Sequence, residues 1–428
     1  MNLTIEPKTN LEGTVKVPGD KSISHRAVML GSLAEGVTEI EGFLTGEDCL
    51  STVQAFQDMG IEIEGVGTKN MKVHGQGLDG LEEPDNVLDL GNSGTTTRLM
   101  LGILAGQDFY SVATGDDSLR QRPMARVTDP VGDMGGKFFG RDNANLLPIT
   151  TIGGQDLEAC TYHSPVASAQ VKSSVLLAGL YAEGETTVVE PAKSRDHTER
   201  LLDYFGADVT VDDLTVSVKG KPQLKGKKVI VPADISSAAF LMVAAAITPD
   251  SELVLENVGL NPTRAGVIEA LEAMNVDLEM LNEREVNGEP IADIKVKTSQ
   301  LQSVVIEGDI IPLLIDEIPI LAVAASQAEG KTIIKDAEEL RVKETDRIDA
   351  MVTELTRLGL EVTEREDGLE IAGPQEIKGG VTCSSYDDHR VAMSLAVAGL
   401  IADEPVEIEE AECINISFPG FKELLMDL

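Results

Sequence analysis

The stretch Lys21-Ser22-Ile23-Ser24-His25-Arg26 is mostly polar or charged, and an apolar run over residues 27–34 follows it directly. A helix that is apolar on nearly all sides is typically buried on all sides, so this stretch predicts a buried helix with a polar N-terminus. The pattern recurs at intervals of about 70–80 residues, which indicates one supersecondary unit used six times. The five other openings are residues 91–96, 168–173, 235–237, 315–317 and 387–390.

A second helix in each repeat has only one apolar face. In the first repeat, apolar side chains recur at helical spacing over residues 50–59, and Gly60 provides a left-handed stop. Alternating residues at 37–40 and 61–64 predict strands. We expect sheets that cover a bundle of buried helices, not a Rossmann sheet. The later amphipathic helices are expected at 123–134, 197–205, 262–274, 346–358 and 419–428.

The charge of the chain excludes several classes of partner. The 428 residues include 35 Lys and Arg against 73 Asp and Glu, a formal net charge of −38. Nucleic acids and anionic membranes bind positively charged surfaces, so we expect neither as a partner. The length suggests about two to three domains.

Cysteine spacing and hydropathy suggest a reduced, cytoplasmic protein. No C-x-x-C pair occurs, so neither a zinc site nor a disulfide framework is expected. Residues 1–7 lack the basic segment and apolar run of a secretory signal. The most apolar stretch, 238–247, is about half the length that spans a bilayer and predicts a buried helix. The cysteines are Cys49, Cys160, Cys383 and Cys413.

Two similar linkers divide the chain. Val17-Pro18-Gly19-Asp20 resembles Val231-Pro232-Ala233-Asp234, and each lies between a predicted strand and a buried helix. If the linkers run side by side, one domain comprises residues 19–231, and the other comprises residues 1–18 with 232–428. Each domain would then hold three repeats, and the paired linkers would act as a hinge.

Positive residues are scarce, yet they gather near the repeat openings. Helix N-termini favour anions, and Arg holds phosphate and carboxylate groups by paired hydrogen bonds. Surface pairing with abundant Asp and Glu would explain one such Arg, but the same placement in five of six repeats favours an anion site. The residues are Lys21, Arg26, Arg98, Arg120, Arg122, Arg126, Lys172, Arg195, Lys343, Arg347 and Arg390.

Two carboxylates stand among these cations. Asp316 lies in an apolar stretch, and Glu344 is next to Lys343. A carboxylate between apolar walls and cations can serve as an acid or a base, because its pKa is tuned by both. For Asp316, a helix cap is an equally good interpretation.

Seven motifs in one order along the chain resemble 5-enolpyruvylshikimate-3-phosphate (EPSP) synthase. The match covers essentially the whole chain. It implies an α/β fold, a two-domain inside-out α/β barrel in which each domain contains three βαβαββ units and closes on substrates. The motifs are residues 18–27 (Pro-Gly-Asp-Lys-Ser-Ile-Ser-His-Arg-Ala), 91–98 (Gly-Asn-Ser-Gly-Thr-Thr-Thr-Arg), 122–124 (Arg-Pro-Met), 168–173 (Ser-Ala-Gln-Val-Lys-Ser), 194–200 (Ser-Arg-Asp-His-Thr-Glu-Arg), 343–347 (Lys-Glu-Thr-Asp-Arg) and 388–390 (Asp-His-Arg).

The resemblance implies enolpyruvyl transfer from phosphoenolpyruvate to the 5-hydroxyl of shikimate 3-phosphate, with release of phosphate and without a metal or cofactor. Asp316 would take the hydroxyl proton, and Lys21 or Glu344 would protonate the methylene carbon. We expect a monomer with these two small molecules as its partners. The shikimate 3-phosphate residues would be Lys21, Ser22, Arg26, Ser168, Gln170, Arg195, Asp316 and Lys343. The phosphoenolpyruvate residues would be Lys21, Gly94, Arg122, Gln170, Arg347 and Arg390.

One departure and two alternatives remain. Some family members have a Lys near the C-terminal Phe-Pro, but residues 413–419 contain none, which suggests the branch often tolerant of glyphosate. UDP-N-acetylglucosamine enolpyruvyl transferases share the fold and the donor, but they use a reactive Cys that residues 106–126 lack. A non-catalytic anion-binding scaffold is the other alternative, and four residues argue against it: Lys21, Asp316, Glu344 and Arg347.

Overall fold

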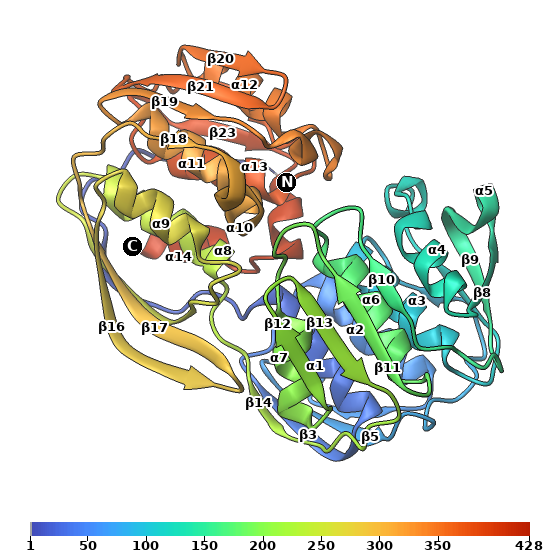
Figure 1. The fold of residues 1–428 in the computed structure, drawn as a ribbon. Helices are drawn as coiled ribbons and strands as arrows, with labels where there is room; N and C mark the ends of the chain where they lie inside the picture. Colours follow the sequence, from blue (N-terminus) through green and yellow to red (C-terminus); the bar gives the residue numbers. More distant parts are fainter. Residues whose placement is uncertain (1) are drawn as a thin grey trace. The chain divides into compact units, whose positions relative to one another are not determined.

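The computed structural model describes residues 2–428, which form two compact units (Figure 1). Unit 1 contains the chain up to Pro18 together with Pro232–Glu285 and Pro290–Leu428. Unit 2 contains Gly19–Val231 and the short segment Val286–Glu289.

Unit 2 is built from the strands and helices drawn in blue to green in Figure 1. Its strands are β3 (Glu35–Glu41), β4 (Glu62–Glu64), β5 (Asn70–Gln76), β6 (Leu88–Asp89), β7 (Ser111–Thr114), β8 (Lys137–Gly140), β9 (Leu146–Ile152), β10 (Thr161–His163), β11 (Glu185–Val189), β12 (Val209–Asp212), β13 (Thr215–Lys219) and β14 (Lys228–Ile230). Its helices are α1 (Lys21–Leu33), α2 (Glu47–Asp58), α3 (Gly94–Ala105), α4 (Ala125–Asp133), α5 (Arg141–Ala144), α6 (Ala169–Gly179) and α7 (His197–Phe205).

Unit 1 combines two N-terminal strands with the C-terminal part of the chain. Its strands are β1 (Leu3–Ile5), β2 (Glu12–Val15), β15 (Glu252–Gly259), β16 (Asp277–Val286), β17 (Glu289–Lys297), β18 (Val305–Ile306), β19 (Gly330–Ile334), β20 (Val362–Arg365), β21 (Gly368–Gly373), β22 (Thr382–Ser384) and β23 (Val406–Glu409). Its helices are α8 (Ile235–Ile247), α9 (Gly266–Ala273), α10 (Ile311–Leu314), α11 (Ile318–Ser326), α12 (Arg347–Arg357), α13 (His389–Gly399) and α14 (Phe421–Asp427).

One pairing pattern recurs in the four-stranded sheets. In the sheet β10-β11-β13-β12, β10 runs parallel to β11, whereas β13 is antiparallel to both β11 and β12. Helix α6 connects β10 to β11 and α7 connects β11 to β12, so the repeat is βαβαββ. The sheets β6-β7-β9-β8 and β18-β19-β21-β20 have the same order and the same strand directions.

Some sheets are completed by a strand from a distant part of the chain. Strand β14 pairs parallel with β3, although about 190 residues separate them. Strand β2 pairs parallel with β15, and β1 pairs antiparallel with β23 near the C-terminus. At the linkers, the backbone N–H of Asp234 donates to the carbonyl oxygen of Pro18 at 2.9 Å, so these two segments lie side by side.

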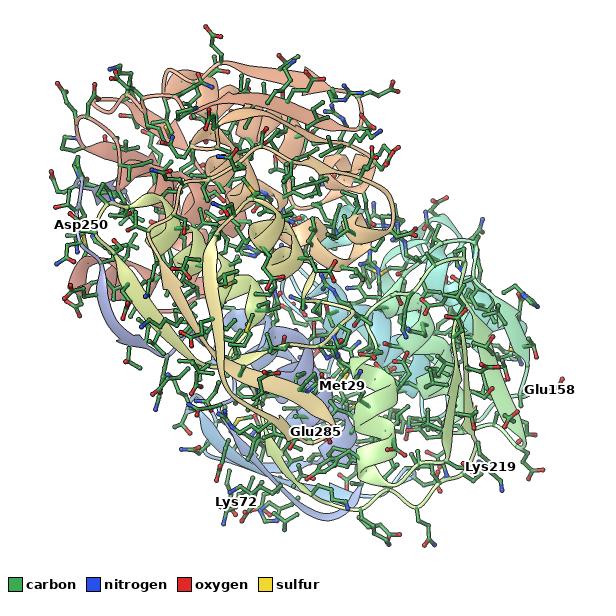
Figure 2. The ribbon with its side chains drawn as sticks, turned by 60° about the vertical axis from the view of Figure 1, so that its left-hand side comes forward. Met29, Lys72, Glu158, Lys219, Asp250 and Glu285 are labelled. Carbon is green, nitrogen blue, oxygen red and sulfur yellow. The ribbon has the colours of Figure 1, made fainter. Side chains whose placement is uncertain are left out.

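The core of each unit is a group of buried helices. In unit 1, α8, α11 and α13 pack on one another, and all residues of α8 from Ile235 to Ala246 are buried. This confirms the buried helix expected over residues 238–247. In unit 2, α3 packs closely on α6. Figure 2 shows Met29 of α1 inside the ribbon, while Lys72 of β5 and Lys219 of β13 lie at its periphery, as burial of the aliphatic helices inside the sheets requires.

The expected amphipathic helices agree with the structure except at some boundaries. Helix α7 has the expected bounds, and α12 lies within the expected range. The expected start of a helix at residue 262 is wrong, because α9 begins at Gly266. The Asn261 side-chain oxygen accepts hydrogen bonds from the backbone N–H of Thr263 at 2.8 Å and from its hydroxyl at 2.7 Å. This local turn competes with the helix.

Across residues 2–428, every helix is too short or too polar to cross a lipid bilayer.

Close approach of α3 and α6 requires a residue without a side chain at position 102. A Cβ on Gly102 would lie 2.2 Å from the carbonyl oxygen of Ser174. Gly102→Ala should therefore lower the free energy of unfolding by about 1–3 kcal/mol, because overpacked helices must separate. Gly132→Ala in α4 is the control, since its Cβ meets open space. That variant should be neutral or more stable by about 0.4–1 kcal/mol. Urea unfolding followed by circular dichroism measures both, and equal stability of the two variants would contradict this packing.

Candidate active site

Helix α1 places the first predicted site residues at its N-terminus. The Asp20 side chain caps the helix by accepting a hydrogen bond from the backbone N–H of Ile23 at 2.8 Å. Lys21 follows and forms an ion pair with Asp48 of α2. Both side chains retain partial exposure, 26% for Lys21 and 11% for Asp48. Lys21 is therefore held in place while its ammonium group stays within reach of a ligand.

The structure brings three predicted residues together around the start of α3. A Cβ on Gly94 would lie 3.2 Å from Nη1 of Arg98 and 3.6 Å from Nη1 of Arg122. Arg98 Nη1 donates to the Gln170 side-chain oxygen at 2.8 Å, and the Gln170 amide donates to Thr95 Oγ1 at 3.1 Å. Gly94, Arg122 and Gln170 thus surround one helix N-terminus with two guanidinium groups, a suitable place for an anion.

Arg26 is deeply buried, with 4% exposure. Its guanidinium donates to Thr198 Oγ1 at 2.6 Å, to Ser173 Oγ at 2.9 Å and to the Ser22 carbonyl oxygen at 3.0 Å. Burial lowers the pKa of Arg26 to about 10, against the opposing charges of Glu199 and Asp20. These bonds connect α1, α6 and α7, the helices that carry or adjoin Ser22, Ser168 and Arg195.

Lys172 is a correction to the sequence analysis, which grouped it with the anion-binding cations. Its side chain is 2% exposed, and its ammonium group lies 2.7 Å from a carboxylate oxygen of Glu190 and 2.7 Å from one of Glu199. Burial acts to lower the pKa of Lys172, but the two carboxylates outweigh it and raise the pKa. Lys172 also donates to the Ser194 carbonyl oxygen at 3.4 Å. Lys172 therefore anchors the segment before Arg195. Its positive charge is neutralised by Glu190 and Glu199 inside the protein.

A chain of hydroxyl groups links the openings of α1 and α3. His25 Nδ1 lies 2.7 Å from Thr52 Oγ1, which lies 2.7 Å from Thr96 Oγ1. Thr96 Oγ1 in turn lies 2.6 Å from Ser93 Oγ, and the Ser93 side chain caps α3. No local pattern in the sequence indicates this chain, because its members come from three different helices.

The second cluster lies in unit 1 and centres on Arg347, the first residue of α12. Its guanidinium donates to Asp388 at 2.8 Å through Nε, to Asp316 at 3.2 Å through Nη1 and to Glu344 at 2.6 Å through Nη2. The Arg347 side chain is 2% exposed. Burial acts to lower the pKa of Arg347, but the charges of Asp388, Glu344 and Asp316 outweigh it and raise the pKa.

Two further cations face Asp316. Lys343 Nζ lies 3.8 Å from Asp316 Oδ1, and Arg390 Nη2 lies 3.9 Å from Asp316 Oδ2. Asp388, to which the sequence analysis gave no role, caps α13 by accepting from the backbone N–H of Arg390 at 2.8 Å. Its position directly before a helix opening was the available signal. The structure does not place Asp316 at a helix-cap position, because it lies inside the short 3₁₀ helix Ile315–Glu317, whose N-cap is Leu314, and its carboxylate contacts side-chain cations.

The predicted site residues therefore fall into two clusters, each described within its own unit. One other group of side chains has a spacing that could hold a metal ion. It consists of Glu62, Glu64 and His74, whose ligand atoms lie within 4.8 Å of one another, and it includes no predicted site residue. The predicted site residues that belong to unit 2, named the unit 2 cluster below, are Lys21, Ser22, Arg26, Gly94, Arg122, Ser168, Gln170 and Arg195. The unit 1 cluster contains Asp316, Lys343, Glu344, Arg347 and Arg390.

Comparisons with known proteins agree over the full chain. The family model described as EPSP synthase (3-phosphoshikimate 1-carboxyvinyltransferase) matches residues 5–425. A 3-phosphoshikimate 1-carboxyvinyltransferase of Petrotoga mobilis is 56% identical over 425 residues, covering 99% of this chain and 98% of the relative. One of Desulforamulus reducens is 57% identical, covering 100% and 99%. An EPSP synthase structure from Acinetobacter baumannii has a TM-score of 0.92 at 48% identity, covering 100% and 98%. This likeness confirms the expected EPSP synthase-like α/β fold.

Buried His25 makes stability depend on pH. Its pKa is lowered from 6.5 to about 3, first by burial and then by the charge of Lys21. The unfolded chain binds a proton at His25 below pH 6.5, whereas the folded chain does not until about pH 3. The contribution of His25 to the free energy of unfolding is therefore fully present above pH 6.5. It falls as the pH drops below that value, and at pH 5.5 the loss is about 1.4 kcal/mol.

The change is measured as the difference between the wild-type chain and His25→Asn in urea unfolding at pH 8 and pH 5.5. The asparagine side chain does not titrate, so the common effects of the other acidic groups cancel. An identical pH dependence of the two proteins would show that His25 is not the responsible group.

Proposed function

The chain belongs to the EPSP synthase family, and we propose that its two cation clusters hold the two anionic substrates of that reaction. The reaction transfers the enolpyruvyl group of phosphoenolpyruvate to the 5-hydroxyl of shikimate 3-phosphate and releases phosphate. The observation that carries this assignment is the identity of 56–57% over essentially the full chain to curated enzymes with this activity. The roles of individual residues are the proposal.

We assign the shikimate 3-phosphate contacts chiefly to unit 2. Ser22 and Ser168 stand at the openings of α1 and α6, where backbone N–H groups favour a phosphate. The hydrogen bonds of Arg26 hold these helices together, and the buried Lys172 supports the segment that ends at Arg195. The remaining proposed contacts are Lys21, Gln170, Asp316 and Lys343.

Phosphoenolpyruvate would bind to cations from both clusters. The guanidinium of Arg122 beside Gly94 supports one end, with Gln170 held by Arg98 as a neighbour. Arg347 and Arg390 supply the other cations, and Lys21 completes the set. A polyanion is well matched to several fixed positive groups, because they need no reorganisation as charge develops.

The chemistry needs one base and one acid. The Asp316 carboxylate takes the proton of the 5-hydroxyl as the oxygen attacks C2 of phosphoenolpyruvate, while Lys21 or Glu344 delivers a proton to C3. A tetrahedral intermediate results. Its C–O bond to phosphate then breaks as C3 loses a proton, which regenerates the double bond. Arg347 supports this by holding Asp316 and Glu344 on one guanidinium.

The alternatives are weaker. Full-length relatives carry the shikimate activity, so a UDP-N-acetylglucosamine enolpyruvyl transferase is not favoured. A non-catalytic scaffold would not need two carboxylates aligned on one guanidinium.

We further propose that units 1 and 2 are the two domains of three repeats each, and that the enzyme is a monomer of the cytoplasm. Sedimentation and cell fractionation test the last two points.

Replacement of Asp316 tests the proposed base. Asp316→Asn keeps the shape of the side chain but removes the proton acceptor, so turnover should fall by about 10²–10⁴-fold while shikimate 3-phosphate still binds. Steady-state release of phosphate and calorimetric titration measure the two effects. Asp309→Asn, an exposed carboxylate in the same unit, is the control. Near-normal turnover would place the base elsewhere, with Glu344 the first alternative.

The enzyme should be partially tolerant of glyphosate, an anion that competes with phosphoenolpyruvate, because glyphosate should bind with reduced affinity. Gly94 leaves room for it, but the missing Lys in residues 413–419 removes one cation, and a charged hydrogen bond contributes about 1.5–3 kcal/mol, or about ten- to a hundredfold in affinity. Gly94→Ala should raise tolerance further and weaken phosphoenolpyruvate binding, because the new Cβ approaches Arg98 and Arg122. Competition kinetics measure both effects, with Gly132→Ala as the control. Inhibition far below the KM for phosphoenolpyruvate would contradict the expected tolerance.

A further inference from the structure

The three central helices of unit 1 are joined at their N-terminal ends by one buried carboxylate. Glu317, the residue that precedes α11, is fully buried. Its Oε1 accepts hydrogen bonds from the hydroxyl of Ser236 in the first turn of α8 and from Nη1 of Arg390 in the first turn of α13, the latter at 3.3 Å. A single side chain therefore determines how these three helix openings meet.

This carboxylate belongs to a longer buried chain of charges. Arg264 donates to the same Ser236 hydroxyl, and its guanidinium lies 3.5 Å from a carboxylate oxygen of Asp234. Asp234, Ser236 and Arg264 have exposures of 7%, 4% and 3%. The chain pairs two carboxylates with two guanidinium groups, so its formal charge is balanced. Balance of this kind is needed, because an isolated buried charge is strongly destabilising.

Arg390 is held from one side by these contacts. Its Nη1 donates both to Glu317 and, at 2.8 Å, to the carbonyl oxygen of Asp316. Its Nη2 lies 3.9 Å from the Asp316 carboxylate, the proposed base. Because Nη1 is committed to these two acceptors, the orientation of the remaining guanidinium edge depends on Glu317 together with the Asp316 carbonyl group.

We propose that Glu317 is a positioning residue that orients Arg390 toward phosphoenolpyruvate, and that Asp234, Arg264 and Ser236 hold Glu317 in place. Glu317 is fully buried and acts through Arg390, so it is not a catalytic residue. The inference rests on the role proposed above for Arg390. Glu317, Asp234, Arg264 and Ser236 all lie outside the seven motifs that resemble EPSP synthase.

The test compares Michaelis constants for the two substrates. Glu317→Gln keeps the size of the side chain but removes its charge, and its amide group would face a donor. We expect the KM for phosphoenolpyruvate to rise about tenfold, whereas the KM for shikimate 3-phosphate and kcat change less than about twofold. Glu317→Asp keeps the charge and should recover part of the loss. An unchanged KM for phosphoenolpyruvate in Glu317→Gln would overturn the proposal.

A double-mutant cycle with Arg390→Lys separates this inference from the role of Arg390. If Glu317 acts through Arg390, the double variant should be less impaired than the product of the single effects, whereas independent effects would multiply and overturn the inference. If Arg390→Lys alone leaves the KM for phosphoenolpyruvate unchanged, the proposed role of Arg390 is itself wrong. If Arg390→Lys raises that KM and Glu317→Gln does not, only the positioning role fails.

Two further variants separate positioning from general stability. Glu354→Gln alters another fully buried carboxylate of unit 1, which accepts from the Tyr386 hydroxyl at 3.0 Å. It should lower stability without raising the KM for phosphoenolpyruvate selectively; a selective rise would mean that any buried carboxylate produces the effect and would overturn the proposal. Ser236→Ala is the second variant if Glu317→Gln does not fold. This variant removes one of the donors that hold the Glu317 carboxylate, so we expect a smaller selective rise in the KM for phosphoenolpyruvate. An unchanged KM would contradict the proposal that Asp234, Arg264 and Ser236 hold Glu317 in place.

Discussion

The unit 1 cluster depends on the buried guanidinium of Arg347, which is shared by Asp316, Glu344 and Asp388. This permanently charged, planar donor lies between the three carboxylates and offsets part of their mutual repulsion. The arrangement gives each carboxylate a different environment. Asp388 is fully buried and caps a helix, whereas Glu344 is about one-third exposed. One cation thus fixes a structural carboxylate and two candidate reacting ones.

In unit 2, uncharged side chains connect the helix openings. The hydroxyls of Thr52, Thr96 and Ser93, together with His25, connect the openings of α1 and α3 without adding charge. Burial keeps His25 neutral at physiological pH. Lys21, whose charge acts on His25, and Arg122 at the start of α3 therefore contribute positive potential in a chain whose formal net charge is −38.

The repeat openings could be predicted from the sequence because helix starts are encoded locally. Asp20, Ser93, Ser168 and Asp388 each cap a helix through a backbone N–H two or three residues later. Residues that act across the fold could not be predicted in this way. Glu317 contacts Ser236 across 81 positions of sequence, and no local pattern indicates such a pair.

Lys172 is a residue whose role the local sequence pattern predicts incorrectly. Its place in a polar helix opening is typical of an anion-binding cation, yet its partners Glu190 and Glu199 come from the following strand–helix segment. Spacing along one helix indicates which residues share a face, but not whether a carboxylate from elsewhere neutralises a charge on it. The candidate site could therefore be predicted by residue type and position, while its supporting contacts required the fold.

The pairing of β1 with β23 constrains how the chain acquires its structure during synthesis. Residues Leu3–Ile5 are synthesised before unit 2, whereas their partner strand Val406–Glu409 is synthesised after it. Almost all of unit 2 is continuous in sequence and lies between these strands. Unit 2 can therefore fold before β23 has been synthesised, and β1 remains without this partner strand until then.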